Sequence, residues 1–164
     1  MKLYFVRHAT ASSKATWAHD DELRPLTRTG RQRFAALVAA LVGADALKPD
    51  VIVTSPLVRA CQTAELLRDG IACDAVVTQD SRLGPDFDLE ALSAILAEHA
   101  DARCLAIVGH NPSFAAVLSA ITGGCDLEMR KGAIALVDVE DPAVASGRLL
   151  WLAPPSLFDG AASR

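Results

Sequence analysis

Two arginines and two histidines are the side chains of this sequence best suited to carry out chemistry. Arg7 and His8 follow a short apolar run, Arg59 follows a Thr-Ser-Pro sequence, and His110 lies between a glycine and an asparagine. A guanidinium group can hold two phosphoryl oxygens at once, and a neutral histidine can attack phosphorus through its unprotonated ring nitrogen. If folding brings these side chains together, they form a site that binds a phosphate group and can accept it covalently.

Each of these side chains also has an ordinary structural interpretation. An Arg-His pair at the end of a strand is often only a polar entrance to a loop, and a lone arginine in a first helical turn is usually solvated. A single histidine can be a hydrogen-bonded member of the core. The phosphate-site interpretation therefore depends on whether the elements of the fold place the four side chains together.

Short apolar runs alternate with longer amphipathic ones, which is typical of helices packed on a mostly parallel sheet. We expect parallel strands at residues 3–6, 51–53, 75–78 and 104–108, each apolar enough to be covered on both faces. Two further strands, at residues 133–139 and 148–152, are joined by a connection too short for a helical crossover. We therefore expect them to pair as an antiparallel edge.

Four amphipathic segments predict helices, at residues 28–42, 56–68, 89–99 and 112–122. Thr27 is a candidate N-cap of the first helix, and Gly43 marks its end. Ser55-Pro56 and Asn111-Pro112 are typical helix starts, because a small polar side chain can cap free amides and proline lacks an amide that would have no partner there. The apolar stripe of the first helix comprises Phe34, Leu37, Val38, Leu41 and Val42.

These elements predict an α/β fold, a single-domain three-layer α/β/α sandwich with a mostly parallel central sheet and an antiparallel edge. The domain would span residues 1–158, and residues 159–164 would form a frayed tail. Arg7, His8, Arg59 and His110 would all follow carboxyl ends of strands, where open α/β sheets bind ligands and where helix N-termini attract anions. The polar segment at residues 12–22 would line the rim of this pocket.

The composition argues against several other classes of protein. Sixteen basic and twenty acidic residues give a net charge of −4, which does not indicate a broad nucleic-acid-binding face. The longest run of small apolar residues is about half a bilayer span, and the N-terminus lacks a signal-peptide pattern. We expect a cytoplasmic protein with no nucleic-acid or membrane partner. The cysteines, expected to be reduced and to bind no metal, are Cys61, Cys73, Cys104 and Cys125.

Three stretches together resemble the histidine phosphatase superfamily, which includes cofactor-dependent phosphoglycerate mutases and acid phosphatases. They read Leu-Tyr-Phe-Val-Arg-His-Ala at 3–9, Thr-Ser-Pro-Leu-Val-Arg-Ala-Cys-Gln-Thr-Ala at 54–64, and Val-Gly-His-Asn-Pro at 108–112. The Arg-Pro-Leu-Thr sequence at 24–27, followed by Gly30, is more narrowly similar to SixA-type phosphohistidine phosphatases. The resemblance implies a phosphoglycerate mutase-like fold and hydrolysis without a metal or other cofactor.

The resemblance also implies roles for individual residues. His8 would be the nucleophile and would be phosphorylated transiently, while Arg7, Arg59 and His110 would hold the phosphoryl oxygens. Arg24, Gly109 and Asn111 are further candidates for substrate binding. His19 and His99 receive no functional role.

Family members that act on phosphate esters usually carry a glutamate that protonates the leaving oxygen, and the matching stretch here, residues 81–88, contains none. Asp86 or Asp88 could supply the acid, although Asp88 is also a candidate helix N-cap. A phosphorylated imidazole leaves more readily, because its ring can be protonated near neutral pH. The favoured substrate is therefore phosphohistidine on a partner protein. A small-molecule phosphomonoesterase and a non-catalytic phosphate-binding module remain as alternatives.

Overall fold

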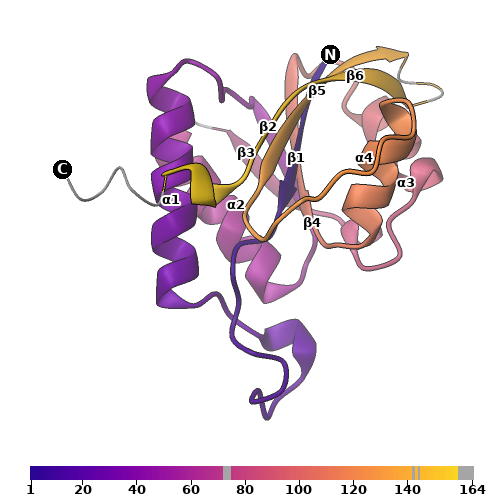
Figure 1. Cartoon of the computed structure of the whole chain (residues 1–164). Helices are drawn as coiled ribbons and strands as arrows, with labels where there is room; N and C mark the ends of the chain where they lie inside the picture. Colours follow the sequence, from indigo (N-terminus) through magenta and orange to yellow (C-terminus); the bar gives the residue numbers. More distant parts are fainter. Residues whose placement is uncertain (72–74, 142, 144, 159–164) are drawn as a thin grey trace.

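The computed structural model describes residues 1–71, 75–141, 143 and 145–158 of the chain, and it contains a mixed sheet with helices on both faces (Figure 1). The strands are β1 (Lys2–Arg7), β2 (Val51–Thr54), β3 (Val76–Gln79), β4 (Cys104–Gly109), β5 (Ile134–Asp141) and β6 (Ser146–Ala153). The helices are α1 (Arg28–Gly43), α2 (Val58–Ile71), α3 (Leu89–Glu98) and α4 (Ser113–Ile121), with short 3₁₀ helices η1 (Asp21–Leu23), η2 (Ser81–Leu83) and η3 (Pro155–Phe158).

The strand order is β3-β2-β4-β1-β5-β6. The first four strands of this order are parallel, whereas β5 pairs antiparallel with β1 and β6 pairs antiparallel with β5. The expected mostly parallel sheet with an antiparallel edge is therefore confirmed. In the register of β1 against β4, Arg7 lies opposite Gly109, so the carboxyl ends of these two strands meet at the same edge.

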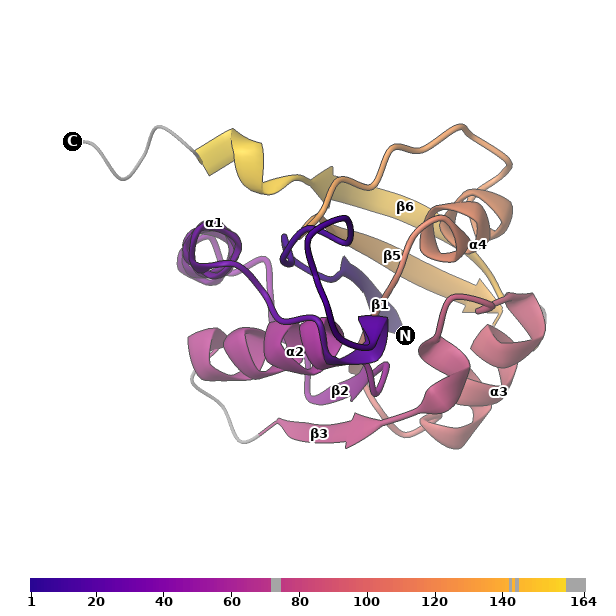
Figure 2. The same cartoon turned by 90° about the horizontal axis from the view of Figure 1, so that it is seen from below.

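Two hydrophobic cores, one on each face of the sheet, make the molecule three-layered. Buried residues of α1 and α2 belong to one core, and buried residues of α3 and α4 belong to the other. Figure 2 shows these helix pairs on opposite sides of the strands. Successive side chains of a strand point to opposite faces, so β1 contributes Tyr4 and Val6 to the first core and Leu3 and Phe5 to the second. This burial on both faces holds the end of β1 rigidly at the edge of the sheet.

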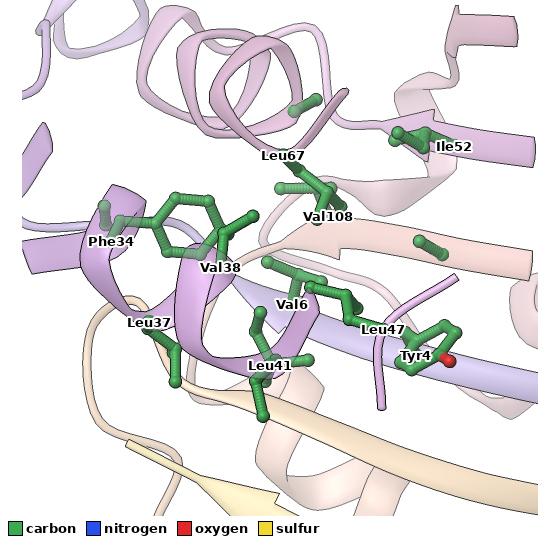
Figure 3. Packing of buried hydrophobic residues seen from close by; sticks show 14 of the residues in the cluster. Tyr4, Val6, Phe34, Leu37, Val38, Leu41, Leu47, Ile52, Leu67 and Val108 are labelled. Atoms are coloured by element: carbon green, nitrogen blue, oxygen red, sulfur yellow. The ribbon is translucent and has the colours of Figure 1, made fainter. Parts of the chain in front are cut away.

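Helix α1 forms as the sequence predicts. The Thr27 hydroxyl oxygen accepts a hydrogen bond of 2.9 Å from the Gly30 amide and so caps the helix. Its apolar stripe lies in the same core as Val6 of β1 and Leu67 of α2, and Val38 and Leu41 lie on the side of α1 toward Val6 (Figure 3).

Helix α2 begins at Val58, two residues later than the expected start at Pro56. The Leu57 carbonyl accepts the first helical hydrogen bond, from the Cys61 amide at 3.1 Å. Ser55 lies outside the helix, and its hydroxyl accepts a long bond of 3.4 Å from the Leu57 amide. The predicted helix start at Ser55-Pro56 was therefore wrong.

Two other expectations need correction. Strand β3 is not covered on both faces, because it lies at the edge of the sheet and Val76 is 60% exposed. Helix α4 begins at Ser113, with Pro112 as its N-cap residue and no side-chain capping bond, and the Asn111-Pro112 peptide bond is cis. The Asn111 side-chain oxygen accepts no hydrogen bond from the described residues, so Asn111 does not cap this helix.

The β5–β6 hairpin is longer than expected, since its strands extend over residues 134–141 and 146–153. After it, η3 contacts α1, and Phe158 packs against the core on that face. The expected tail at residues 159–164 and Cys73 lie outside the described residues. In the part of the chain that the structure describes, no helix is long and apolar enough to cross a membrane.

Candidate active site

A cavity of about 720 Å³ opens at the carboxyl edge of the parallel strands. The segment that joins β1 to α1 crosses this edge (Figure 2), and its residues Ser12, Ser13, Lys14 and Asp21 line the cavity, as expected for residues 12–22. The sequence-predicted residues that line it are Arg7, His8, Arg24, Arg59, His110 and Asn111.

The end of β1 and the end of β4 bring the two histidines together. The His8 amide donates to the Gly109 carbonyl at 3.0 Å, which extends the β1–β4 ladder by one residue. The centres of the His8 and His110 rings lie 5.1 Å apart. His8 is 7% exposed and His110 is 3% exposed, so both rings are held in nearly fixed positions.

Thr63, in the second turn of α2, joins this helix to the end of β1. Its hydroxyl donates to the Arg59 carbonyl at 2.7 Å and accepts from the Ala9 amide at 3.1 Å. Arg59, one turn earlier, is 5% exposed and faces the cavity. A fully buried threonine thus ties the segment that carries His8 to the helix that carries Arg59.

The backbone selects the tautomer of His8. Its Nδ1 lies 2.7 Å from the carbonyl oxygen of Ala9, and a carbonyl oxygen only accepts hydrogen bonds. The proton of the neutral ring is therefore on Nδ1, and Nε2 carries the free electron pair. Burial, with smaller contributions from the charges of Arg59 and Arg7, lowers the pKa of His8 to about 3. His8 is accordingly neutral at physiological pH, and its Nε2 electron pair is available for attack.

His110 is neutral as well. Burial and the charge of Arg59 lower its pKa to about 4. Its Nε2 lies 2.8 Å from the Ser55 hydroxyl, and its Nδ1 is buried without a hydrogen-bond partner among the described residues. Ser55 was interpreted from the sequence only as a helix cap, and no local signal distinguishes that role from a bond to a histidine far along the chain.

The lowered histidine pKa values predict an acid-sensitive fold. The unfolded chain binds protons near the ordinary histidine pKa of 6.5, whereas folded His8 and His110 bind them only near 3 and 4. Stability is therefore fully present above pH 6.5 and is lost as the pH falls toward these folded values. In urea titrations between pH 7 and pH 4, we expect the free energy of unfolding to fall less steeply for His8→Gln than for the wild type.

The matched control for this measurement is His19→Gln, because His19 is exposed. Its pH dependence should follow that of the wild type. Equal slopes for His8→Gln and the wild type would show that the folded protein does not hold His8 in its neutral form.

The bond between the Ser55 hydroxyl and His110 Nε2 indicates that Ser55 positions the His110 ring. Ser55→Ala should lower stability by about 1 kcal/mol and lower kcat/KM for any phosphate substrate by about 10-fold, because the His110 ring loses the partner that orients it. Ser113→Ala is the control, since the Ser113 hydroxyl donates to the His110 backbone carbonyl at 3.0 Å and leaves the ring untouched. If Ser55→Ala and Ser113→Ala are similarly stable but only Ser55→Ala loses kcat/KM, the positioning role is supported. If the two variants lose stability and kcat/KM equally, it is contradicted.

Asp21 links two cavity arginines and was not singled out from the sequence. Its carboxylate accepts from Arg24 Nε at 2.9 Å and lies 3.1 Å from Arg59 Nη2, while its backbone carbonyl accepts from Arg59 Nη1 at 2.8 Å. Burial would raise the pKa of Asp21, but the hydrogen bond from Arg24 and the charge of Arg59 outweigh it and lower that pKa. Asp21 is therefore an ionised orienting group and a poor proton donor.

Arg7 and Asn111 share a backbone acceptor. Arg7 Nη1 donates to the Met129 carbonyl at 2.6 Å, and Asn111 Nδ2 donates to the same oxygen at 3.1 Å. Among the described residues, all the buried side-chain polar atoms without a hydrogen-bond partner belong to residues of this site: Arg7 Nε, Arg59 Nε, His110 Nδ1 and Asn111 Oδ1. Buried polar groups are nearly always paired, so this cluster is typical of a ligand site.

Three candidates lie elsewhere than at the cavity. Gly109 does not line it, and a Cβ there would come within 2.2 Å of the Phe114 ring, so this glycine permits close packing of β4 on α4. Asp88 accepts from the Ala91 amide at 2.9 Å and caps α3. Asp86 is exposed, and of residues 85–88 only Pro85 reaches the cavity.

The remaining histidines and possible metal ligands lie apart from the site. His19 contacts the Trp17 ring, and His99 is the C-cap residue of α3. Within residues 1–71, 75–141, 143 and 145–158, no three His, Cys, Asp or Glu side chains come together as metal ligands.

The chain matches one family model and one curated relative. The model of the histidine phosphatase superfamily (branch 1) matches residues 3–84, half of the chain. An uncharacterised protein from Picosynechococcus sp. (strain ATCC 27264 / PCC 7002 / PR-6) is 39% identical over 127 residues, which cover 76% of this chain and 74% of that protein.

Solved structures share the fold over nearly the whole chain. The protein histidine phosphatase SixA, complexed with tungstate, superposes with a TM-score of 0.84 at 23% identity, covering 97% of this chain and 100% of that one. The alpha-ribazole phosphatase from Shigella flexneri superposes with a TM-score of 0.73 at 16% identity, covering 94% of this chain and 97% of that one. At these identities the likeness establishes the fold, and it confirms the expected three-layer α/β architecture.

Proposed function

Because the chain belongs to branch 1 of the histidine phosphatase superfamily, we propose that it hydrolyses phosphohistidine on a partner protein through a phosphorylated His8. Arg7, Arg59 and His110 hold the phosphoryl oxygens in this proposal, and Arg24 and Asn111 complete the pocket. No metal takes part.

The cluster of unpaired buried atoms is the observation that carries the proposal. Arg7 Nε and Arg59 Nε are N–H donors, and both belong to residues that line the same cavity as His8. A phosphoryl group offers several acceptor oxygens to such donors. The superfamily structure that carries tungstate, a tetrahedral oxyanion, supports the same class of ligand.

The proposed reaction has two displacements. The free electron pair of His8 Nε2 attacks phosphorus, and the P–N bond to the substrate imidazole breaks. That imidazole takes up a proton and leaves as a neutral ring. Water then attacks phospho-His8, its proton is lost to solvent, inorganic phosphate leaves, and His8 returns to its neutral form. Positioning and neutralisation of charge supply most of the catalysis in phosphoryl transfer, which suits a site made of two arginines and two neutral histidines.

The acid–base groups of the cavity favour a P–N bond over a phosphate ester. An ester leaves as a strongly basic alkoxide and needs a proton from a nearby acid. Asp21, the acidic residue that lines the cavity, is held ionised by Arg24 and Arg59. Asp86 and Asp88 do not line the cavity. A substrate imidazole, by contrast, can be protonated by solvent near neutral pH.

A direct comparison of substrates tests this proposal. Purified protein should release phosphate from a phosphohistidine-bearing phosphotransfer domain with a kcat/KM at least about 100-fold above that for sugar phosphates, a gap of about 2.7 kcal/mol. The opposite preference would indicate a small-molecule phosphomonoesterase. Binding of phosphate analogues without turnover of any donor would indicate a phosphate-binding module.

A further inference from the structure

A second cavity adjoins the candidate active site. It has a volume of about 320 Å³, and Arg7 and Lys131 line both cavities. We call this second cavity the basic side cavity. Its other charged lining residues are Arg33 on α1 and Glu128 and Arg130 in the segment before β5. Its wall includes part of η3, which lies beside α1 in both views (Figures 1 and 2).

Positive charge is concentrated around these two cavities. The chain as a whole carries sixteen basic and twenty acidic residues. Of the residues that the structure describes, seven basic and two acidic ones line the cavities. A cleft lined by one sign of charge attracts partners of the other sign and raises their association rate. The basic residues are Arg7, Lys14, Arg24, Arg33, Arg59, Arg130 and Lys131, and the acidic ones are Asp21 and Glu128.

The acidic lining residues leave the charge of Lys131 uncompensated. Asp21 binds two arginines of the first cavity, and Glu128 forms a single exposed ion pair with Arg130 at 3.4 Å. Lys131 is exposed and makes no ion pair or side-chain hydrogen bond with any residue that the structure describes. An anion at the boundary between the cavities would therefore meet an uncompensated ammonium group.

We propose that the basic side cavity binds carboxylate side chains that flank the phosphohistidine, so that the partner protein is recognised through an acidic surface. This inference rests on the proposed function. A protein substrate can present such carboxylates beside its phosphorylated residue, and the two cavities adjoin at Arg7 and Lys131. Glutamate and aspartate are the natural counterparts of the arginine fork and the lysine ammonium.

Binding of two matched peptides tests the inference. Both carry a triazole analogue of phosphohistidine that cannot be hydrolysed, and one has glutamates and the other glutamines on each side of it. Calorimetry in low salt should give the wild type an affinity about 10-fold higher for the glutamate peptide, as expected for two exposed charge pairs. The preference should shrink as salt is added. The double variant Arg130→Gln/Lys131→Gln should bind both peptides equally.

The double variant Arg103→Gln/Arg148→Gln is the control, because it removes the same charge from the opposite edge of the sheet, where the Arg103 side chain is 92% exposed. It should keep the wild-type preference. Equal affinity of the wild type for both peptides, or binding of neither, would overturn the inference. So would a selective loss of affinity of the Arg130→Gln/Lys131→Gln protein for a sugar bisphosphate. If the wild type hydrolyses no phosphohistidine, the proposed function fails, whatever the peptides show.

Discussion

Replacement of His8 by alanine should reduce phosphatase turnover by at least about 10⁴-fold, because it removes the atom proposed to bond to phosphorus. Acid-labile phosphate should be trapped by rapid quench on the wild type and be missing from His8→Ala. The trapped phosphate should map to His8 after proteolysis under alkaline conditions.

The control for the His8 variant is His19→Ala, which replaces an exposed histidine and should keep full turnover. Circular dichroism of His8→Ala should show an intact fold, so that the loss can be assigned to chemistry. Equal amounts of trapped phosphate on the wild type and on His8→Ala would exclude His8 as the nucleophile. Retention of turnover by His8→Ala would also exclude His8 as the nucleophile.

The positions of Arg7 and His8 were predictable because they depend on local sequence. An apolar run short enough to be a strand precedes them, and its alternating residues fill the cores on both faces of the sheet. In a parallel sheet the carboxyl ends of strands lie at the same edge, and the pairing of β1 with β4 makes their ends neighbours. The register of Arg7 opposite Gly109 then brings His8 close to His110.

The partners of the site residues were not predictable, because they come from distant parts of the chain. Ser55 carries the same local signal whether it caps a helix or bonds to His110, and only the packing of β2 against β4 decides. Asp21 lies in a polar segment without hydrophobic periodicity, where nothing marks a carboxylate that orients two arginines. Gly109 shows the opposite case, since a motif position expected at the substrate instead contacts Phe114.

Removal of the Arg59 guanidinium should also lower kcat/KM strongly. Arg59→Gln should lower kcat/KM by about 10² to 10³-fold, because a preorganised donor to the phosphoryl oxygens is lost. Arg59→Lys keeps the charge but not the planar fork, so its kcat/KM should stay at least about 10-fold below that of the wild type. Steady-state kinetics on a phosphohistidine-bearing protein measure both effects, and Arg68→Gln, an exposed arginine of the same helix, should leave kcat/KM unchanged.

The Arg59 series also separates catalysis from folding. Arg59 holds η1 through the Asp21 carbonyl at 2.8 Å, so a purely structural role would lower the free energy of unfolding and leave the kcat of the folded fraction intact. Asp21→Asn should keep the hydrogen bond to that carbonyl and remove only the carboxylate charge. If Arg59 acts on the phosphoryl group, Asp21→Asn should stay much closer to the wild type in kcat than Arg59→Gln does. An unchanged kcat of folded Arg59→Gln, together with a lowered free energy of unfolding, would assign Arg59 to the support of η1.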